Sequence, residues 1–228
     1  MPLIARDGYV LRHSALNKEA LWVCEHVRRD QLSGNLKRSD AFRPDPLLQP
    51  GDRAELTDYR GSGYDRGHMA PAGDQTVDAR KKDETFYLSN MAPQEPQLNQ
   101  RVWAALEDQV RDWADQRGEV WIITGPMWYD PREDDPSTAR GFVDYWVIGA
   151  NEVAVPTHCY KIVIRPDGNG DVDCVAFVIE NKPGYRAPFH LDEYITSVDF
   201  IEKRTGLNFM PNLSPPAKAR LENSPGHM

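Results

Sequence analysis

The stretch Tyr64-Asp65-Arg66-Gly67-His68-Met69-Ala70-Pro71 contains the residues on which the interpretation of this chain depends. A histidine titrates near neutral pH, so His68 can accept a proton from water. Two positions earlier, Arg66 offers a planar set of N–H donors that matches a phosphate group. Gly67 lets the backbone turn tightly between them. The stretch therefore predicts hydrolysis of a phosphate ester; the alternative is a structural histidine beside an Arg66–Asp65 ion pair.

Length, composition and charge limit the classes of protein that this chain can belong to. Its 228 residues are 40% hydrophobic, which fits one large domain or two small ones with a real core. No stretch has the length of a membrane span, and Met1 to Asp7 lack the apolar run of a secretory signal. The net charge of −8 disfavours a protein that coats or stores nucleic acid, because such binding depends on neutralised phosphates. An enzyme needs positive charge only near its site.

Three cysteines lie far apart in the sequence and have no Cys-x-x-Cys spacing, which excludes a zinc site of that kind. Cys159 and Cys174 flank the turn-forming segment Pro166-Asp167-Gly168-Asn169-Gly170, between two strand-like runs. They therefore face each other across a predicted hairpin either as a disulfide or as two buried thiols.

Apolar runs and turn residues predict the order of the secondary-structure elements. Strands are expected at 9–11, 20–23, 85–89, 120–126, 153–164 and 172–180, a long loop at 34–63, and a short helix near 197–205. Strands and helices alternate irregularly, without the repeated strand–helix–strand order of a parallel sheet. We therefore expect an α+β fold with a mostly antiparallel central sheet flanked by helices.

Residues 98–117 have the clearest helical period. The apolar residues recur at spacings of three and four, and Gly118 stands where a helix would end; they are Trp103, Leu106, Val110 and Trp113. Asn99 falls on the same stripe, and a buried amide needs partners. It either caps the helix or gives its oxygen to a hard metal ion such as Mg²⁺, which keeps several waters and takes few protein ligands.

Glu107 and Arg111 follow on the same helix at a spacing of four, as a helical ion pair would have. A surface salt bridge is the alternative to a role in a site. A straight helix would separate Asn99 from Glu107 by about 12 Å. Glu107 is therefore expected to hold a water bound to the metal rather than the metal itself.

The combined pattern resembles the DNA/RNA non-specific endonucleases, which are ββα-metal nucleases. The resemblance rests on Asp65 to His68, on Tyr87-Leu88-Ser89-Asn90-Met91-Ala92-Pro93-Gln94, and on Leu98-Asn99 with the helix that follows. It extends to the strand 120–126, to 155–161 and to 197–209. It implies a single endonuclease domain over residues 8–213, with 214–228 as a flexible tail.

The resemblance implies a role for each matching residue of the site. His68 would be the general base, Asn99 the direct ligand of Mg²⁺, and Glu107 a ligand to that ion's waters, with Mn²⁺ as a substitute. Asn90 would support the geometry of the site.

The resemblance also implies arginines that contact phosphate. Arg66 and Arg111 match the family's positions directly. A further arginine is expected upstream, where Arg38 fits best and Arg43 and Arg53 stay open.

The function implied is hydrolysis of phosphodiester bonds in DNA and RNA to 5′-phosphate products. A catalytically silent nucleic-acid-binding module and a small-nucleotide phosphodiesterase are the alternatives. Relatives are often dimers, so a homodimer is a further expectation, as is a protein inhibitor. A secreted or periplasmic location is favoured over a cytoplasmic one, although this chain has no signal peptide.

Overall fold

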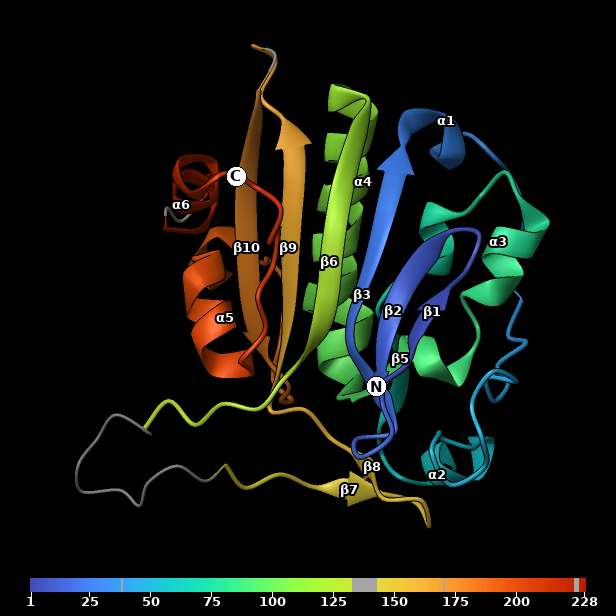
Figure 1. Cartoon of the computed structure of the whole chain (residues 1–228). Helices are drawn as coiled ribbons and strands as arrows, with labels where there is room; N and C mark the ends of the chain where they lie inside the picture. Colours follow the sequence, from blue (N-terminus) through green and yellow to red (C-terminus); the bar gives the residue numbers. More distant parts are fainter. Residues whose placement is uncertain (38, 133–142, 170, 224–225) are drawn as a thin grey trace.

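The computed structural model describes residues 1–37, 39–132, 143–169, 171–223 and 226–228. A seven-stranded sheet runs through the molecule in the order β1-β2-β3-β6-β9-β10-β11, and neighbouring strands pair antiparallel (Figure 1). The strands are β1 (Leu3–Ala5), β2 (Tyr9–Ser14), β3 (Glu19–Arg28), β6 (Glu119–Met127), β9 (His158–Pro166), β10 (Val172–Glu180) and β11 (Ile195–Thr196). The predicted α+β class with a mostly antiparallel sheet is confirmed.

Two small sheets and several short helices complete the described chain. β4 (Asp65–His68) pairs with β5 (Met91–Gln94), and β7 (Val147–Ile148) pairs with β8 (Val153–Ala154). The helices are α1 (Arg29–Leu32), α2 (Leu56–Tyr59), α3 (Ala79–Glu84), α4 (Ala104–Arg117), α5 (Val198–Thr205) and α6 (Pro215–Asn223). A π-helical segment, η3 (Leu98–Trp103), leads into α4, and the 3₁₀ segments are η1 (Ala72–Asp74), η2 (Leu88–Asn90) and η4 (Leu191–Tyr194).

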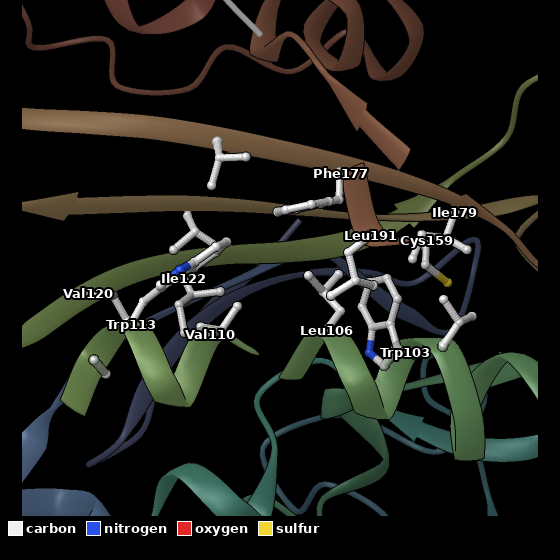
Figure 2. Packing of buried hydrophobic residues seen from close by; sticks show 14 of the residues in the cluster. Trp103, Leu106, Val110, Trp113, Val120, Ile122, Cys159, Phe177, Ile179 and Leu191 are labelled. Atoms are coloured by element: carbon white, nitrogen blue, oxygen red, sulfur yellow. The ribbon is translucent and has the colours of Figure 1, made fainter. Parts of the chain in front are cut away.

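One face of the sheet is covered by α4. The stripe predicted from the sequence, Trp103, Leu106, Val110 and Trp113, points toward strand residues such as Ile122 and Phe177 (Figure 2). All of these side chains are almost completely buried. At about 25 cal/mol per Å² of apolar surface removed from water, this packing is the main force that holds α4 on the sheet.

The opposite face is covered near β9 and β10 by α5 and α6 (Figure 1). Ser197 caps α5 by accepting from the Phe200 N–H, and Gly206 ends it with a left-handed φ of 68°. The described part of the expected flexible tail contains a helix. Residues 215–223 form α6, because Leu221 buries its side chain in the same apolar cluster as Ile201.

Three other expectations differ locally from the structure. Residues 85–89 do not form a strand: Leu88 starts the short segment η2, and the strand follows as β5. The predicted strand 153–164 is split into β8 and β9 around Pro156, which has no N–H to donate. The loop 34–63 contains the one-turn helix α2, with Asp58 accepting from the Glu55 backbone N–H at 2.7 Å.

Cys159 and Cys174 are both free, buried thiols. In the β9–β10 ladder Cys159 pairs with Ile179, whereas Cys174 pairs with Ile164. Because successive side chains alternate between the faces of a sheet, this register places the two thiols on opposite faces. The alternative of two buried thiols is therefore the one that the structure shows.

Candidate active site

The candidate site is built from β4, β5 and the helical segment that follows them in sequence. His68 pairs with Met91, and Gly67 pairs with Ala92. A Cβ atom on residue 67 would approach the side-chain oxygen of Gln94 to 2.1 Å, so a larger residue there would force the buried Gln94 side chain to shift. The chain then enters η3 and α4, which completes a β-β-α unit against one face of the large sheet.

The imidazole ring of His68 packs against two aromatic rings. Its ring centroid lies 5.2 Å from that of Phe86, edge-on, and 5.5 Å from that of Phe42. The Arg66 guanidinium stacks on the same Phe42 ring at 4.1 Å. Arg66 and His68 therefore share one face of β4, as their two-residue spacing requires. The rings leave the imidazole little room to change its rotamer.

Asn90 is fully buried beneath this strand. Its side-chain oxygen accepts from the Ala70 N–H at 3.0 Å, and its amide nitrogen donates to the carbonyls of Ala70 and Thr85, both at 2.9 Å. These three bonds tie the backbone that leaves His68 to the segment before β5. Asn90 thus fixes the path of the chain next to the site.

The amide of Asn99 is held by Asp65. Its nitrogen donates to Asp65 Oδ2 at 2.8 Å, and Gln100 donates to the same oxygen at 2.7 Å. A carboxylate only accepts hydrogen bonds, so the nitrogen of Asn99 must face Asp65 and its Oδ1 must point away. The π-helical geometry of η3, a feature often found at functional sites, places Asn99 and Gln100 together over Asp65.

Arg111 and Glu107 lie on α4 but do not pair with each other. Arg111 donates to Asp74 at 2.9 Å and to Asp108 at 2.5 Å, so the ion pair expected at a spacing of four is replaced by these two. Despite the opposing effect of burial, Asp74 raises the pKa of Arg111. Burial raises the pKa of Glu107 to about 7, against the attraction of Lys161.

A buried cation and a buried acid lie underneath these groups. Lys161 is 1% exposed, donates to the Thr124 hydroxyl at 2.7 Å, and lies 5.0 Å from the Trp103 ring. Burial lowers the pKa of Lys161, while Glu107 and Glu25 oppose this effect. Burial also raises the pKa of Glu25, whose carboxylate has no hydrogen-bond partner among the described residues. The floor of the site is therefore a network of ionisable groups.

A pocket of about 430 Å³, here called the His68 pocket, joins the parts of the site. It is lined by His68, Asn99, Glu107 and Arg111, together with Lys82, Gln100 and the small residues that follow β4. Four of the sequence-predicted residues thus share one pocket. Arg66 does not line it, but lines a second pocket beside Asp65.

The upstream arginines stand as follows. Arg38, the position favoured from the sequence, lies outside the described residues. Arg43 pairs with Asp83 at 2.5 Å, and Arg53 pairs with Glu55 at 2.9 Å while donating to two backbone carbonyls. Both of these arginines are therefore engaged in holding the loop that precedes β4.

The oxygen donors of the pocket suit a hard cation that keeps most of its waters. Asn99 presents an oriented amide oxygen, and Glu107 adds a carboxylate. Among the described residues no group of three or more histidine, cysteine, aspartate or glutamate side chains could enclose a metal ion. A largely hydrated ion on one or two protein oxygens, as Mg²⁺ prefers, fits this donor set.

The sequence did not indicate Asp65 as the partner of Asn99, nor did it indicate Asp74, Lys161 and Glu25 as parts of the site. Asp65 stood in the motif but was considered only as a partner of Arg66. The other three lie on elements whose contact with α4 depends on the tertiary fold. Only the apolar surroundings of Glu25 and Lys161 in their strands signalled that these charges are buried.

Over most of its length the chain is similar to known nucleases. Residues 2–215 match the family model described as DNA/RNA non-specific endonuclease. The chain is 39% identical over 212 residues to the mitochondrial endonuclease G of Homo sapiens, covering 92% of this chain and 70% of that protein. It is 35% identical to nuclease C1 of Cunninghamella echinulata var. echinulata over 92% of this chain and 83% of that protein.

A solved structure is similar over almost the whole chain. It is the crystal structure of the EndoG/EndoGI complex, which addresses the mechanism of EndoG inhibition, and it matches with a TM-score of 0.86 and 34% identity. The match covers 96% of this chain and 88% of the other. Several relatives are mitochondrial by name, whereas the sequence analysis favoured a secreted or periplasmic location. Within the described ranges, none of the helices combines the length and the apolar character that a membrane span requires.

Proposed function

The chain belongs to the DNA/RNA non-specific endonuclease family, a family of metal-dependent phosphodiester hydrolases, and from this premise we propose which of its residues cut nucleic acid and how. The observation that carries the proposal is the His68 pocket, in which an imidazole, an oriented amide oxygen, a carboxylate and a guanidinium line one space. Such a pocket can bind a phosphodiester next to a general base.

His68 takes a proton from a water molecule, and the oxygen of that water attacks phosphorus. The bond from phosphorus to the 3′ oxygen breaks, the leaving oxygen receives a proton from water, and the product keeps a 5′-phosphate. A positioned base of this kind contributes about 10²–10⁴-fold to the rate. The aromatic rings of Phe42 and Phe86 hold the imidazole in place for this step.

Asn99 would hold Mg²⁺ directly, and Glu107 would hold it through water. When bound, the ion supplies Lewis-acid stabilisation of the charge that develops on the phosphate and the leaving group. Asp65 fixes the direction of the Asn99 amide. Arg111, held by Asp74, contacts the phosphate from the pocket, and Arg66 contacts it from the neighbouring pocket. Arg38 stays a prediction for a third contact.

Contacts of this kind address the phosphate backbone and not the edges of the bases, so we expect little sequence preference. DNA and RNA are then both substrates. A protein inhibitor is a second part of the proposal, supported by the inhibitor complex of the similar solved structure. A homodimer and a secreted or periplasmic location stay predictions from the sequence.

The test is digestion of supercoiled plasmid and of a structured RNA with Mg²⁺, with Mn²⁺, and with EDTA. We expect cleavage of both substrates with either ion and none in EDTA. Cleavage that persists in EDTA would contradict the metal-dependent mechanism. Tight binding to DNA without any cleavage in Mg²⁺ would instead identify a silent binding module. Cleavage of a dinucleotide but not of plasmid would identify a small-nucleotide phosphodiesterase.

A further inference from the structure

A second pocket, of about 340 Å³, lies on the other side of Asp65 and is here called the Arg60 pocket. Its lining combines two guanidinium groups, two tyrosine rings, one leucine and one carboxylate: Leu56, Tyr59, Arg60, Tyr64, Asp65 and Arg66. The site described above uses Asp65 and Arg66 from this pocket. Arg60 and Tyr64 have no role in it.

A single side chain, that of Asp65, connects the Arg60 pocket with the His68 pocket. Asp65 lines the Arg60 pocket, and its Oδ2 accepts from Asn99 and Gln100, both of which line the His68 pocket. The two pockets thus meet at Asp65, and we expect a chain of nucleotides with one phosphate in the His68 pocket to continue toward the Arg60 pocket. The two hydrogen bonds to Asp65 also offset part of its negative charge at this boundary.

The backbone around Arg60 and Tyr64 is an ordered turn. Gly61 and Gly63 have φ values of 70° and 87°, which other residues rarely adopt, and added Cβ atoms there would meet only open space. Ser62 fastens the turn: its hydroxyl donates to the Tyr59 carbonyl at 2.9 Å and accepts from the Tyr64 N–H at 3.2 Å. The turn thus reverses the chain between Arg60 and Tyr64 and holds both beside β4.

The positive charge of Arg60 is available to bind an anionic ligand. Arg60 is exposed, and it forms no ion pair with any residue in the described parts of the chain. Two other exposed arginines are paired by contrast: Arg28 with Asp30, and Arg220 with Asp171. In a chain with a net charge of −8, an arginine without a carboxylate partner beside a tyrosine ring is suited to a phosphate and its base.

We propose that the Arg60 pocket binds the nucleotide next to the cleaved phosphodiester, with Arg60 on its phosphate and the Tyr64 ring against its base. This subsite rests on the proposed function, because it lies beside the phosphate that His68 attacks. The subsite contacts the sugar-phosphate backbone and one face of a nucleobase. It therefore favours nucleic-acid chains over single phosphodiesters, and it does not select among the four bases.

A binding measurement tests the two parts of the subsite separately. A fluorescein-labelled single-stranded DNA of 12 nucleotides is titrated with protein in EDTA at several KCl concentrations. Arg60→Ala should lower the slope of log affinity against log salt by about 0.7, the value for one lost contact to single-stranded phosphate. Tyr64→Ala should weaken binding by about 5-fold or more without changing the slope, because it removes a stacking ring but no charge.

The matched control is Arg12→Ala, which removes an exposed arginine of β2 that lines a different pocket. It should leave the salt slope unchanged. An Arg60→Ala slope equal to that of wild type, or a Tyr64→Ala affinity equal to that of wild type, would overturn the corresponding half of the subsite.

Kinetics distinguish failure of the subsite from failure of the proposed function. With Mg²⁺, Arg60→Ala should raise KM for the 12-nucleotide DNA about 10-fold and leave kcat, and the hydrolysis of bis(p-nitrophenyl) phosphate, unchanged. Equal losses on both substrates would place Arg60 in the chemistry and overturn the subsite. A wild-type protein that cuts neither substrate would contradict the proposed function, while the salt slopes would still decide whether Arg60 binds phosphate.

Discussion

The side-chain nitrogen of Asn99 donates a 2.8 Å hydrogen bond to Asp65, a residue of the strand that carries His68. This bond connects the two halves of the β-β-α unit and determines which end of the Asn99 amide faces the pocket. The proposed base and the proposed metal ligand therefore depend on one carboxylate for their relative orientation.

Removal of that carboxylate should weaken metal binding. In Asp65→Ala the Asn99 amide can rotate and present its nitrogen to the pocket, so we expect affinity for Mg²⁺ and Mn²⁺ to fall about 10–100-fold. Calorimetric titration of the protein with each ion measures this directly. Asp192→Ala, an exposed carboxylate outside the site, is the control. Equal affinities for Asp65→Ala and wild type would show that Asp65 does not orient the ligand.

Lys161, the buried cation beneath the pocket, should contribute to the free energy of unfolding. Lys161→Met removes the positive charge that faces Glu25 and Glu107 from β9, whereas Asp74 keeps its ion pair with Arg111. Uncompensated buried charges cost about 3–5 kcal/mol of unfolding free energy. Denaturant unfolding at pH 7 measures the loss. Adding Glu25→Gln to the variant should restore part of it, and a Lys161→Met protein as stable as wild type would contradict the inferred network.

Stability should also depend on pH through Glu19, which does not line the His68 pocket. Both of its carboxylate oxygens are buried without a hydrogen-bond partner among the described residues, and burial raises its pKa well above the ordinary value. The folded state therefore keeps a proton that the unfolded state loses, so stability is full below about pH 4 and falls as pH rises.

Glu19→Gln should remove this part of the pH dependence. Its unfolding free energy relative to wild type should increase between pH 5 and pH 8, by about 1.4 kcal/mol for each unit by which the pKa of Glu19 is raised. Thermal and denaturant unfolding at both pH values provide the comparison, with Glu193→Gln, an exposed glutamate, as the control. Parallel pH profiles of the two proteins would show that Glu19 is not the responsible group.

The sequence predicted the parts of the fold that depend on local pattern. The stripe from Trp103 to Trp113 packs on the sheet as its period indicated, and the strands around Ile122 and Phe177 lie where their apolar runs stood. The π-helical geometry at Asn99 could not be predicted, because a wider turn leaves no mark in an apolar period of three and four. The expected strand at 85–89 failed because Phe86 is buried by its contacts with other rings rather than by strand pairing.

The part of the candidate site that could be predicted consists of the residues that belong to the sequence motifs. His68, Asn99, Glu107 and Arg111 share a pocket, as the resemblance implied. The partners of these residues were not predictable. Asp74 reaches Arg111 from a different segment, and Lys161 reaches its place because Thr124 stands opposite it in the β6–β9 ladder. Such contacts follow from strand register and helix placement, which a single sequence does not specify.

The central claim is that His68 acts as the base in the chemical step. Its most direct test is the single-turnover rate of DNA cleavage by His68→Ala at saturating Mg²⁺, with the affinity for the same DNA measured in parallel. The account predicts a rate at least about 100-fold below that of wild type with nearly unchanged affinity. A rate within threefold of wild type at equal affinity would contradict it.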